Sequence, residues 1–122
     1  MKGIFINCSV FPFIYYILNG SKTVETRTRN VFKNLIGERV ALIRTGKGIP
    51  MVYGYATLGT PYRVGRDDSR SRVHAFIACT EYDIKPGKTK LFYPLLDVKS
   101  CDPYPVPTDR INHGRSYTEW RD

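Results

Sequence analysis

Short stretches in which apolar and polar residues alternate, separated by glycine and proline, most constrain the fold of this chain. In residues 51–58, small and aliphatic side chains share one face of an extended strand, and Tyr53 and Tyr55 share the other. Gly54 lies inside this stretch, which predicts close approach of another backbone or the bend that a small barrel needs. Residues 39–44 are almost continuously apolar, as expected of a central strand buried on both faces. These patterns favour a β-rich fold.

The remaining segments predict further strands, few helices and many turns. Residues 13–20 have apolar side chains at helical spacing and end at Gly20, a residue suited to the left-handed stop of a helix. Residues 31–35 can form one more helical turn, and the prolines of residues 103–107 impose an extended segment. Other strand-like patterns occupy residues 2–8, 24–29 and 91–98. We therefore predict a mostly β (α+β) fold, a small β-barrel with two or three short helices in a single domain over residues 1–122.

Length and composition are those of an ordinary globular domain. The chain has 122 residues, of which 42% are hydrophobic and 25% charged, and this is enough for a substantial core. No apolar run approaches the roughly 18–20 residues that a membrane-spanning helix needs. Residues 1–6 are apolar but short, and polar residues follow them directly, so we expect a first strand there and not a secretory signal. We expect a cytoplasmic protein without a membrane partner.

Three cysteines, Cys8, Cys79 and Cys101, are widely spaced and odd in number. No pair has the C-x-x-C spacing of a zinc or redox site, and His74 and His113 are the only histidines that can join them as ligands. We therefore expect free, reduced thiols, and we predict no metal site and no cofactor.

Positive charge is the clearest compositional indication of a partner. Nineteen Lys and Arg against eleven Asp and Glu give a formal charge of +8 and a pI near 9.6, which favours attraction to polyanions such as nucleic acid. Nine Tyr and six Phe add aromatic rings on which bases can stack. The Arg-rich residues 63–72 are expected to form an exposed loop, which either steers a polyanion or is simply solvated. Residues 74–80 are apolar and fit a strand or a helix.

Charged side chains are concentrated at residues 20–27, directly after the predicted helix. Glu25 and Arg27 share a face if the strand is regular, whereas Lys22 joins them only if it still lies in the turn. Lys22 can hold a phosphate or transfer a proton, and Glu25 can accept a hydrogen bond from a base edge or act as a general base. Arg27 can bind a phosphate or keep Glu25 ionised, although a structural ion pair is the alternative. The run predicts a site for an anionic or polar ligand, with Arg29 on the same strand face.

A second group of candidate residues lies at the end of the predicted central strand. Arg44, Thr45 and Lys47 lie in or beside a glycine-rich turn whose backbone N–H groups can cradle a phosphate. The turn lacks the P-loop pattern, so nucleotide hydrolysis is not implied. Tyr53 and Tyr55 can stack a base from their strand face. A plain basic hairpin and a second core face are the alternatives to these two roles.

The spacing Gly20-x-Lys22-x-x-Glu25-x-Arg27 matches the G-x-K-x-x-E-x-R signature of ASCH domains, which belong to the PUA-like superfamily. The resemblance is close over the first half of the chain and weak over residues 63–90. Further segments resemble the family in the same order along the chain: residues 1–6, 13–20, 37–43, 54–58 and 95–98, the last followed by 103–107.

The resemblance implies a PUA-like β-barrel with a cleft lined by the signature residues. Relatives bind RNA or modified bases, some ASCH proteins are reported as ribonucleases, and others are amidases that deacetylate an acetylated cytidine nucleoside. In these amidases a threonine, the proposed nucleophile, stands at the position of Glu25, so its absence here favours recognition over catalysis. We therefore predict binding of RNA, a modified nucleobase, a nucleotide or a nucleoside in a basic cleft. The alternatives are a metal-independent ribonuclease or nucleoside amidohydrolase that uses Lys22 and Glu25, and a protein-interaction domain.

Overall fold

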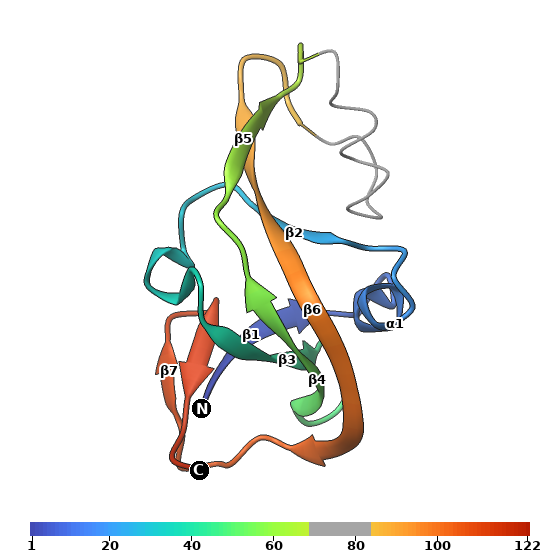
Figure 1. The fold of residues 1–122 in the computed structure, drawn as a ribbon, viewed down its shortest axis with the longest axis vertical. Helices are drawn as coiled ribbons and strands as arrows, with labels where there is room; N and C mark the ends of the chain where they lie inside the picture. Colours follow the sequence, from blue (N-terminus) through green and yellow to red (C-terminus); the bar gives the residue numbers. More distant parts are fainter. Residues whose placement is uncertain (69–83) are drawn as a thin grey trace.

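The computed structural model describes residues 1–68 and 84–122, and strands dominate it (Figure 1). Along the chain these residues form β1 (Lys2–Asn7), α1 (Phe13–Leu18), β2 (Val24–Arg27), the 3-10 turn η1 (Lys33–Leu35), β3 (Arg39–Thr45), β4 (Met51–Leu58), β5 (Tyr62–Gly65), β6 (Thr89–Pro105), β7 (Ile111–His113) and β8 (Tyr117–Glu119). The prediction of a mostly β fold with short helices is confirmed. Within the described ranges, no helix has the length and apolar character required to cross a membrane.

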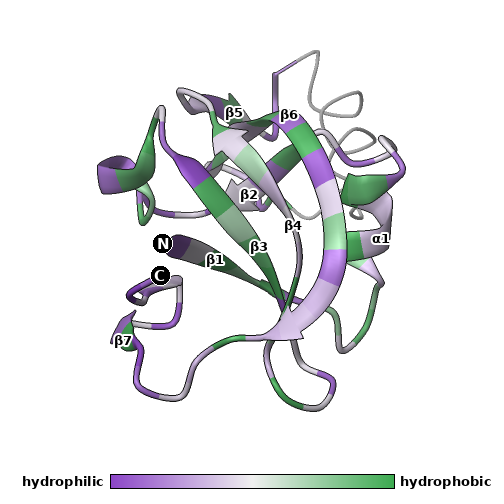
Figure 2. Ribbon diagram, turned by 60° about the horizontal axis from the view of Figure 1, so that its bottom comes forward, coloured by the Kyte–Doolittle hydropathy of each residue, from purple (hydrophilic) through white to green (hydrophobic). Residues whose placement is uncertain are grey.

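The strands form one curled sheet that is organised around β6. Their order across the sheet is β2-β6-β4-β3-β1-β8-β7, and β5 also pairs with β6. β1 and β3 run parallel, whereas the other paired strands are antiparallel. Figure 1 shows β6 extending along most of the molecule, and Figure 2 shows it bending round β4. Because one long strand pairs with β2, β5 and β4 in turn, the sheet curls into a half-barrel.

The main core lies between the curled sheet and α1. The buried α1 residues Ile14 and Ile17 pack with buried residues of β1, β3, β4 and β6. Hydrophobic segments of α1, β1 and β3 are green in Figure 2. β3 contributes to two clusters, since Val40 and Leu42 belong to the main core while Ala41 and Ile43 belong to a smaller one on the other side. This confirms the prediction that residues 39–44 form a central strand buried on both faces.

A β-bulge in β4 overturns the prediction that Tyr53 and Tyr55 share a face. Leu42 pairs with Gly54 and Ile43 pairs with Val52, so Tyr53 is an extra residue without a partner in β3. Tyr53 consequently packs against the main core, whereas Tyr55 packs against the smaller cluster on the opposite side of the sheet. An aromatic face for base stacking is therefore absent from β4.

Two glycine predictions are confirmed. Gly20 follows α1 with φ of +85°, the left-handed conformation that stops a helix. A Cβ at Gly54 would collide with the carbonyl oxygen of Lys99 in β6, so the backbones of β4 and β6 approach closely here.

The prediction of an exposed loop over residues 63–72 is wrong for its first residues. Tyr62–Gly65 forms β5, which pairs with the first residues of β6. Sequence alternation in so short a segment is weak, and its partner strand is more than twenty residues away. The ambiguous residues 74–80, with His74 and Cys79, lie outside the described part of the chain.

Candidate functional site

Strand β2 points Glu25 and Arg27 away from the neighbouring Val24. Val24 packs into a small apolar cluster with Val64, Ile84 and Phe92. Because side chains alternate along a strand, the side chains of residues 25 and 27 lie on the opposite face, where both line one cavity. Pairing with β6 holds β2 in register, with Glu25 opposite Tyr93. The predicted shared face of Glu25 and Arg27 is confirmed.

One carboxylate oxygen of Glu25 contacts two cationic side chains and one backbone N–H group. Its Oε1 lies 3.0 Å from Nη1 of Arg27 and 3.7 Å from Nζ of Lys22, and it accepts a 2.9 Å hydrogen bond from the backbone N–H of Thr26. The residues Glu25 and Lys22 are only 5% and 2% exposed. A buried charge is costly unless it is paired and hydrogen-bonded, and these contacts supply both the opposite charges and the hydrogen bond for the carboxylate.

Lys22 joins this group because it lies in the turn that precedes β2. Its backbone N–H donates to the carbonyl of Tyr16, which ties the turn to α1. Strand alternation does not begin until Val24, so it does not direct Lys22 away from Glu25. The ammonium group also lies 4.9 Å from the ring centre of Phe13. The condition set by the sequence, that Lys22 must still be in the turn, is therefore met.

Arg27 is anchored by the protein backbone and by an aromatic ring. Its Nη2 donates to the carbonyl of Phe5 at 2.8 Å, and its Nη1 donates to the carbonyl of Thr26 at 3.0 Å. Its guanidinium lies 5.0 Å from the ring centre of Phe32. Both terminal nitrogens of Arg27 thus donate to the protein, and these contacts hold its guanidinium beside Glu25; phosphate binding by Arg27 stays a prediction.

Tyr93 supports this arrangement from β6. Its ring lies 5.1 Å from that of Phe32, and its hydroxyl donates to Oδ1 of Asn30 at 2.7 Å. Tyr93 is fully buried, and burial raises the pKa of its phenol above the usual 10.0. The hydroxyl is therefore a neutral donor at physiological pH. Tyr93 packs against Phe32, Phe32 lies against Arg27, and Arg27 contacts Glu25, so this stack of side chains helps to keep Glu25 in place.

A cavity of about 300 Å³ opens beside this group. Four of its lining side chains are cations and one is a carboxylate. The lining residues are Phe5, Ile6, Asn7, Phe13, Lys22, Glu25, Thr26, Arg27, Lys90 and Arg115. Such a cavity suits a ligand with anionic character and at least one hydrogen-bond donor for Glu25.

Besides Thr26 of β2, sequence reasoning missed three polar residues of this cavity that lie outside residues 20–27. Asn7 lies at the end of β1, Lys90 near the start of β6, and Arg115 in the turn between β7 and β8. Each is far along the chain from residues 20–27, and none stands in a motif of its own. Pairing of β6 with β2 places Lys90 next to Arg27, and the fold of the sheet brings Asn7 and Arg115 to the same cavity, so their local sequence carried no signal of the site.

The structure places the other predicted ligand-binding residues elsewhere. Arg29 lines a second cavity, of about 630 Å³. Arg44, Lys47 and Tyr53 line a third, of about 230 Å³. Arg44 lies over the ring of Tyr53 and donates to its hydroxyl at 2.8 Å, while its buried Nε has no hydrogen-bond partner among the described residues.

Thr45 and Tyr55 make structural contacts. The carbonyl of Thr45 accepts a hydrogen bond from the backbone N–H of Cys8 in the β1–α1 connection, and the Tyr55 hydroxyl bonds that of Tyr104. Neither residue lines the cavity beside Glu25. Cys8 and Cys101 are free thiols, as expected, and Cys79 lies outside the described residues. Across residues 1–68 and 84–122, His, Cys, Asp and Glu form no group of three that would hold a metal ion.

Crystal structures of ASCH from Zymomonas mobilis share this fold over nearly the whole chain. A Tyr-to-Phe variant superposes with a TM-score of 0.72 at 22% identity and covers 99% of this chain and 91% of its own. A Ser-to-Ala variant gives 0.70 at 23% identity, with coverage of 98% and 88%. A third structure of the same protein gives 0.67 at 22% identity, with coverage of 98% and 87%. No protein-family model and no curated protein matches the sequence. The chain therefore has the ASCH fold, a curled and mostly β half-barrel.

Proposed function

We propose that this protein binds RNA, or a nucleotide with a modified base, in the cavity beside Glu25. The observation that carries the proposal is a buried carboxylate, held between Lys22 and Arg27, in a cavity whose other charged walls are cationic. A structural ion pair needs no cavity, whereas here the cavity reaches all three residues.

The chemistry of the cavity matches the two parts of a nucleotide. An ionised carboxylate accepts hydrogen bonds from exocyclic amino and ring N–H groups on a base edge. Lys90 and the exposed Arg115, which line the same cavity, supply positive charge for a phosphate. A volume of about 300 Å³ is at the lower end for small-molecule sites, so it suits one nucleotide unit.

Binding to a short fluorescent RNA and to free nucleotides tests the proposal directly. We expect micromolar or tighter binding of the RNA that weakens as salt rises, because phosphate contacts release counterions. Arg115→Ala should weaken binding several-fold. Glu25→Gln should reduce discrimination between bases by roughly ten-fold or more, since a well-placed base contact contributes about 1–3 kcal/mol.

The matched control is Arg121→Ala, which removes the same charge from an exposed site outside the cavity. Its affinity for RNA should be close to that of the unmodified protein, and lower only by the small effect of one unit of net charge. Absence of binding to both RNA and nucleotides at micromolar protein would overturn the proposal. Equal effects of the Arg115 and Arg121 substitutions would show attraction to overall charge alone.

One observation supports hydrolysis as a second candidate function. Lys22 Nζ lies 3.7 Å from Glu25 Oε1 at the cavity, a separation from which small shifts allow proton transfer to or from a bound substrate. Incubation with RNA and with an acetylated cytidine nucleoside, with chelator present, tests this metal-independent route. The roles are wrong if folded Lys22→Met and Glu25→Gln variants keep full activity.

A further inference from the structure

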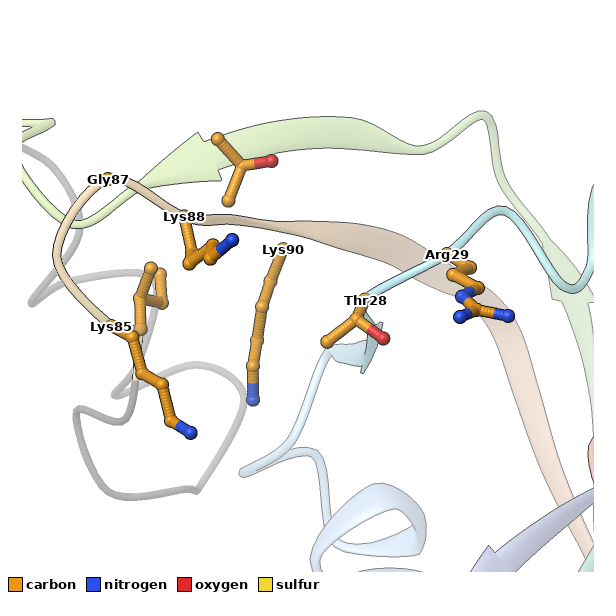
Figure 3. Close-up of a pocket in the computed structure, with 8 residues that line it drawn as sticks. Thr28, Arg29, Lys85, Gly87, Lys88 and Lys90 are labelled. Carbon is orange, nitrogen blue, oxygen red and sulfur yellow. The ribbon is translucent and has the colours of Figure 1, made fainter.

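A second and larger cavity adjoins the one beside Glu25, and Lys90 lines both. Its volume is about 630 Å³. Figure 3 shows Lys85 and Lys88 at the turn before β6, Lys90 on β6, and Arg29 at the far end. The described residues that line it are Thr28, Arg29, Ile84, Lys85, Gly87, Lys88, Thr89 and Lys90.

The two cavities share Lys90, at the point where β2 and β6 run side by side. Arg27 pairs with Leu91 in the antiparallel β2–β6 ladder, so Thr28 and Lys90 are the next residues outward on the two strands. The segment that presents Glu25 and Arg27 to the first cavity therefore continues directly into one wall of the second. The start of β6 forms the other wall.

The linings of the two cavities are strongly biased in charge. Among the residues that the structure describes, seven Lys and Arg line the two cavities, and Glu25 is the one acidic residue that does. The turn that carries Lys85 and Lys88 is closed by a 3.0 Å backbone hydrogen bond between these residues, with Gly87 at φ of +73°. Arg29, Lys85 and Lys88 are exposed, so they can meet a large ligand.

We infer that the ligand of the first cavity is one unit of a single-stranded polynucleotide, whose sugar–phosphate backbone continues along the second cavity. The inference rests on the proposed function. A row of cations such as Arg29, Lys85, Lys88 and Lys90 neutralises successive phosphates and carries no base information, while Glu25 reads the base at one end. A base can enter the first cavity only when it is unpaired, and this selects single strands, loops or ends over duplex.

The test compares a mononucleotide with single-stranded RNA of two, four and eight nucleotides at several salt concentrations. We expect affinity to rise at least ten-fold between the mononucleotide and the octanucleotide. The double variant Lys85→Gln with Lys88→Gln should bind the octanucleotide more weakly. Its plot of log affinity against log salt should become shallower by about 0.7 for each lost phosphate contact. Its affinity for the mononucleotide should not change.

The control is Lys33→Gln with Lys99→Gln, which removes two exposed lysines from outside both cavities. This variant should keep the original salt slope. If mononucleotide binding is intact but affinity is independent of length, or if the Lys85 and Lys88 variant keeps its slope, the polynucleotide inference is wrong while the proposed function stands. Loss of mononucleotide and RNA binding alike overturns both. If polyglutamate displaces the labelled octanucleotide as well as unlabelled octanucleotide does, the partner is an acidic protein, and this result also overturns the inference.

Discussion

Glu25 stabilises the protein and forms the candidate site through the same oxygen atom. Its Oε1 contacts Lys22, Arg27 and the N–H of Thr26, so removing the carboxylate leaves two cations near one another in a poorly solvated place. A loss of ligand binding in a Glu25 variant is therefore ambiguous by itself. The two contributions must be separated by choosing substitutions that affect stability and recognition differently.

Glu25→Gln should lower the free energy of unfolding by about 3 kcal/mol, because breaking a buried ion pair on one side leaves uncompensated charge. The double variant Lys22→Met with Glu25→Leu should recover most of that loss, since apolar side chains of similar volume often replace a buried pair without net cost. Urea denaturation measures both changes.

The same double variant separates recognition from packing. Having lost the carboxylate and the ammonium group, it should be stable but should fail to bind RNA or nucleotides. If it binds as well as the unmodified protein, the buried ions are purely structural, and the ligand is recognised by the remaining cations alone.

Among the elements, β4 and β6 depend on a close backbone contact at Gly54. An added Cβ there would meet the carbonyl of Lys99 and also Cδ2 of Leu18, at 3.0 Å. Backbone cannot move aside as a flexible side chain can, so Gly54→Ala should lower the free energy of unfolding by about 1–3 kcal/mol. Chemical denaturation of the variant checks this value.

Gly65→Ala is the matched control for the Gly54 substitution. A Cβ at Gly65 in β5 would meet its nearest atoms only at 3.8 and 3.9 Å, which is ordinary contact. Its effect should stay within about 0.5 kcal/mol. If the two alanine variants are equally stable, the close approach of β4 and β6 at Gly54 is not a constraint on folding.

Sequence patterns correctly predict those features whose conformation depends on residues close by in the chain. The helix stop at Gly20, the buried strand over residues 39–44 and the shared face of Glu25 and Arg27 all follow from periodicity within a few residues. The face of Tyr53 was mispredicted because a bulge depends on how β3 pairs with β4. The sequence predicts a loop where β5 forms, because its partner β6 is remote along the chain.

The molecule as a whole assembles the candidate site from five separated segments. The end of β1, the start of α1, the turn before β2 with β2 itself, the start of β6 and the β7–β8 turn each contribute to the cavity. Lys90 and Arg115 become part of the site only through the pairing of β6 with β2 and the overall fold of the sheet. Their roles require the tertiary fold, whereas the charged run at residues 20–27 was visible in the sequence.

Buried phenols should make the whole molecule less stable at alkaline pH. Burial raises the pKa of Tyr93 and of Tyr104 above 10.0, so the folded protein keeps these protons at a pH where the unfolded chain loses them. The unfolded state then binds fewer protons, and stability falls as pH rises. This contribution is complete below about pH 10 and is lost as pH approaches the higher folded values.

Tyr93→Phe tests this dependence at a residue that also supports Phe32 beneath Arg27. At pH 8 the variant should lose about 1 kcal/mol, because the hydrogen bond to Asn30 is gone. Between pH 9.5 and 11 its urea midpoint should fall less steeply than that of the unmodified protein, since one buried phenol no longer ionises on unfolding. Tyr15→Phe, at a side chain that is largely exposed, should leave the slope unchanged. If the urea midpoint falls equally steeply with pH in all three proteins, Tyr93 ionises as readily in the folded protein as in the unfolded chain. The support that Tyr93 gives to the site would then not depend on its burial.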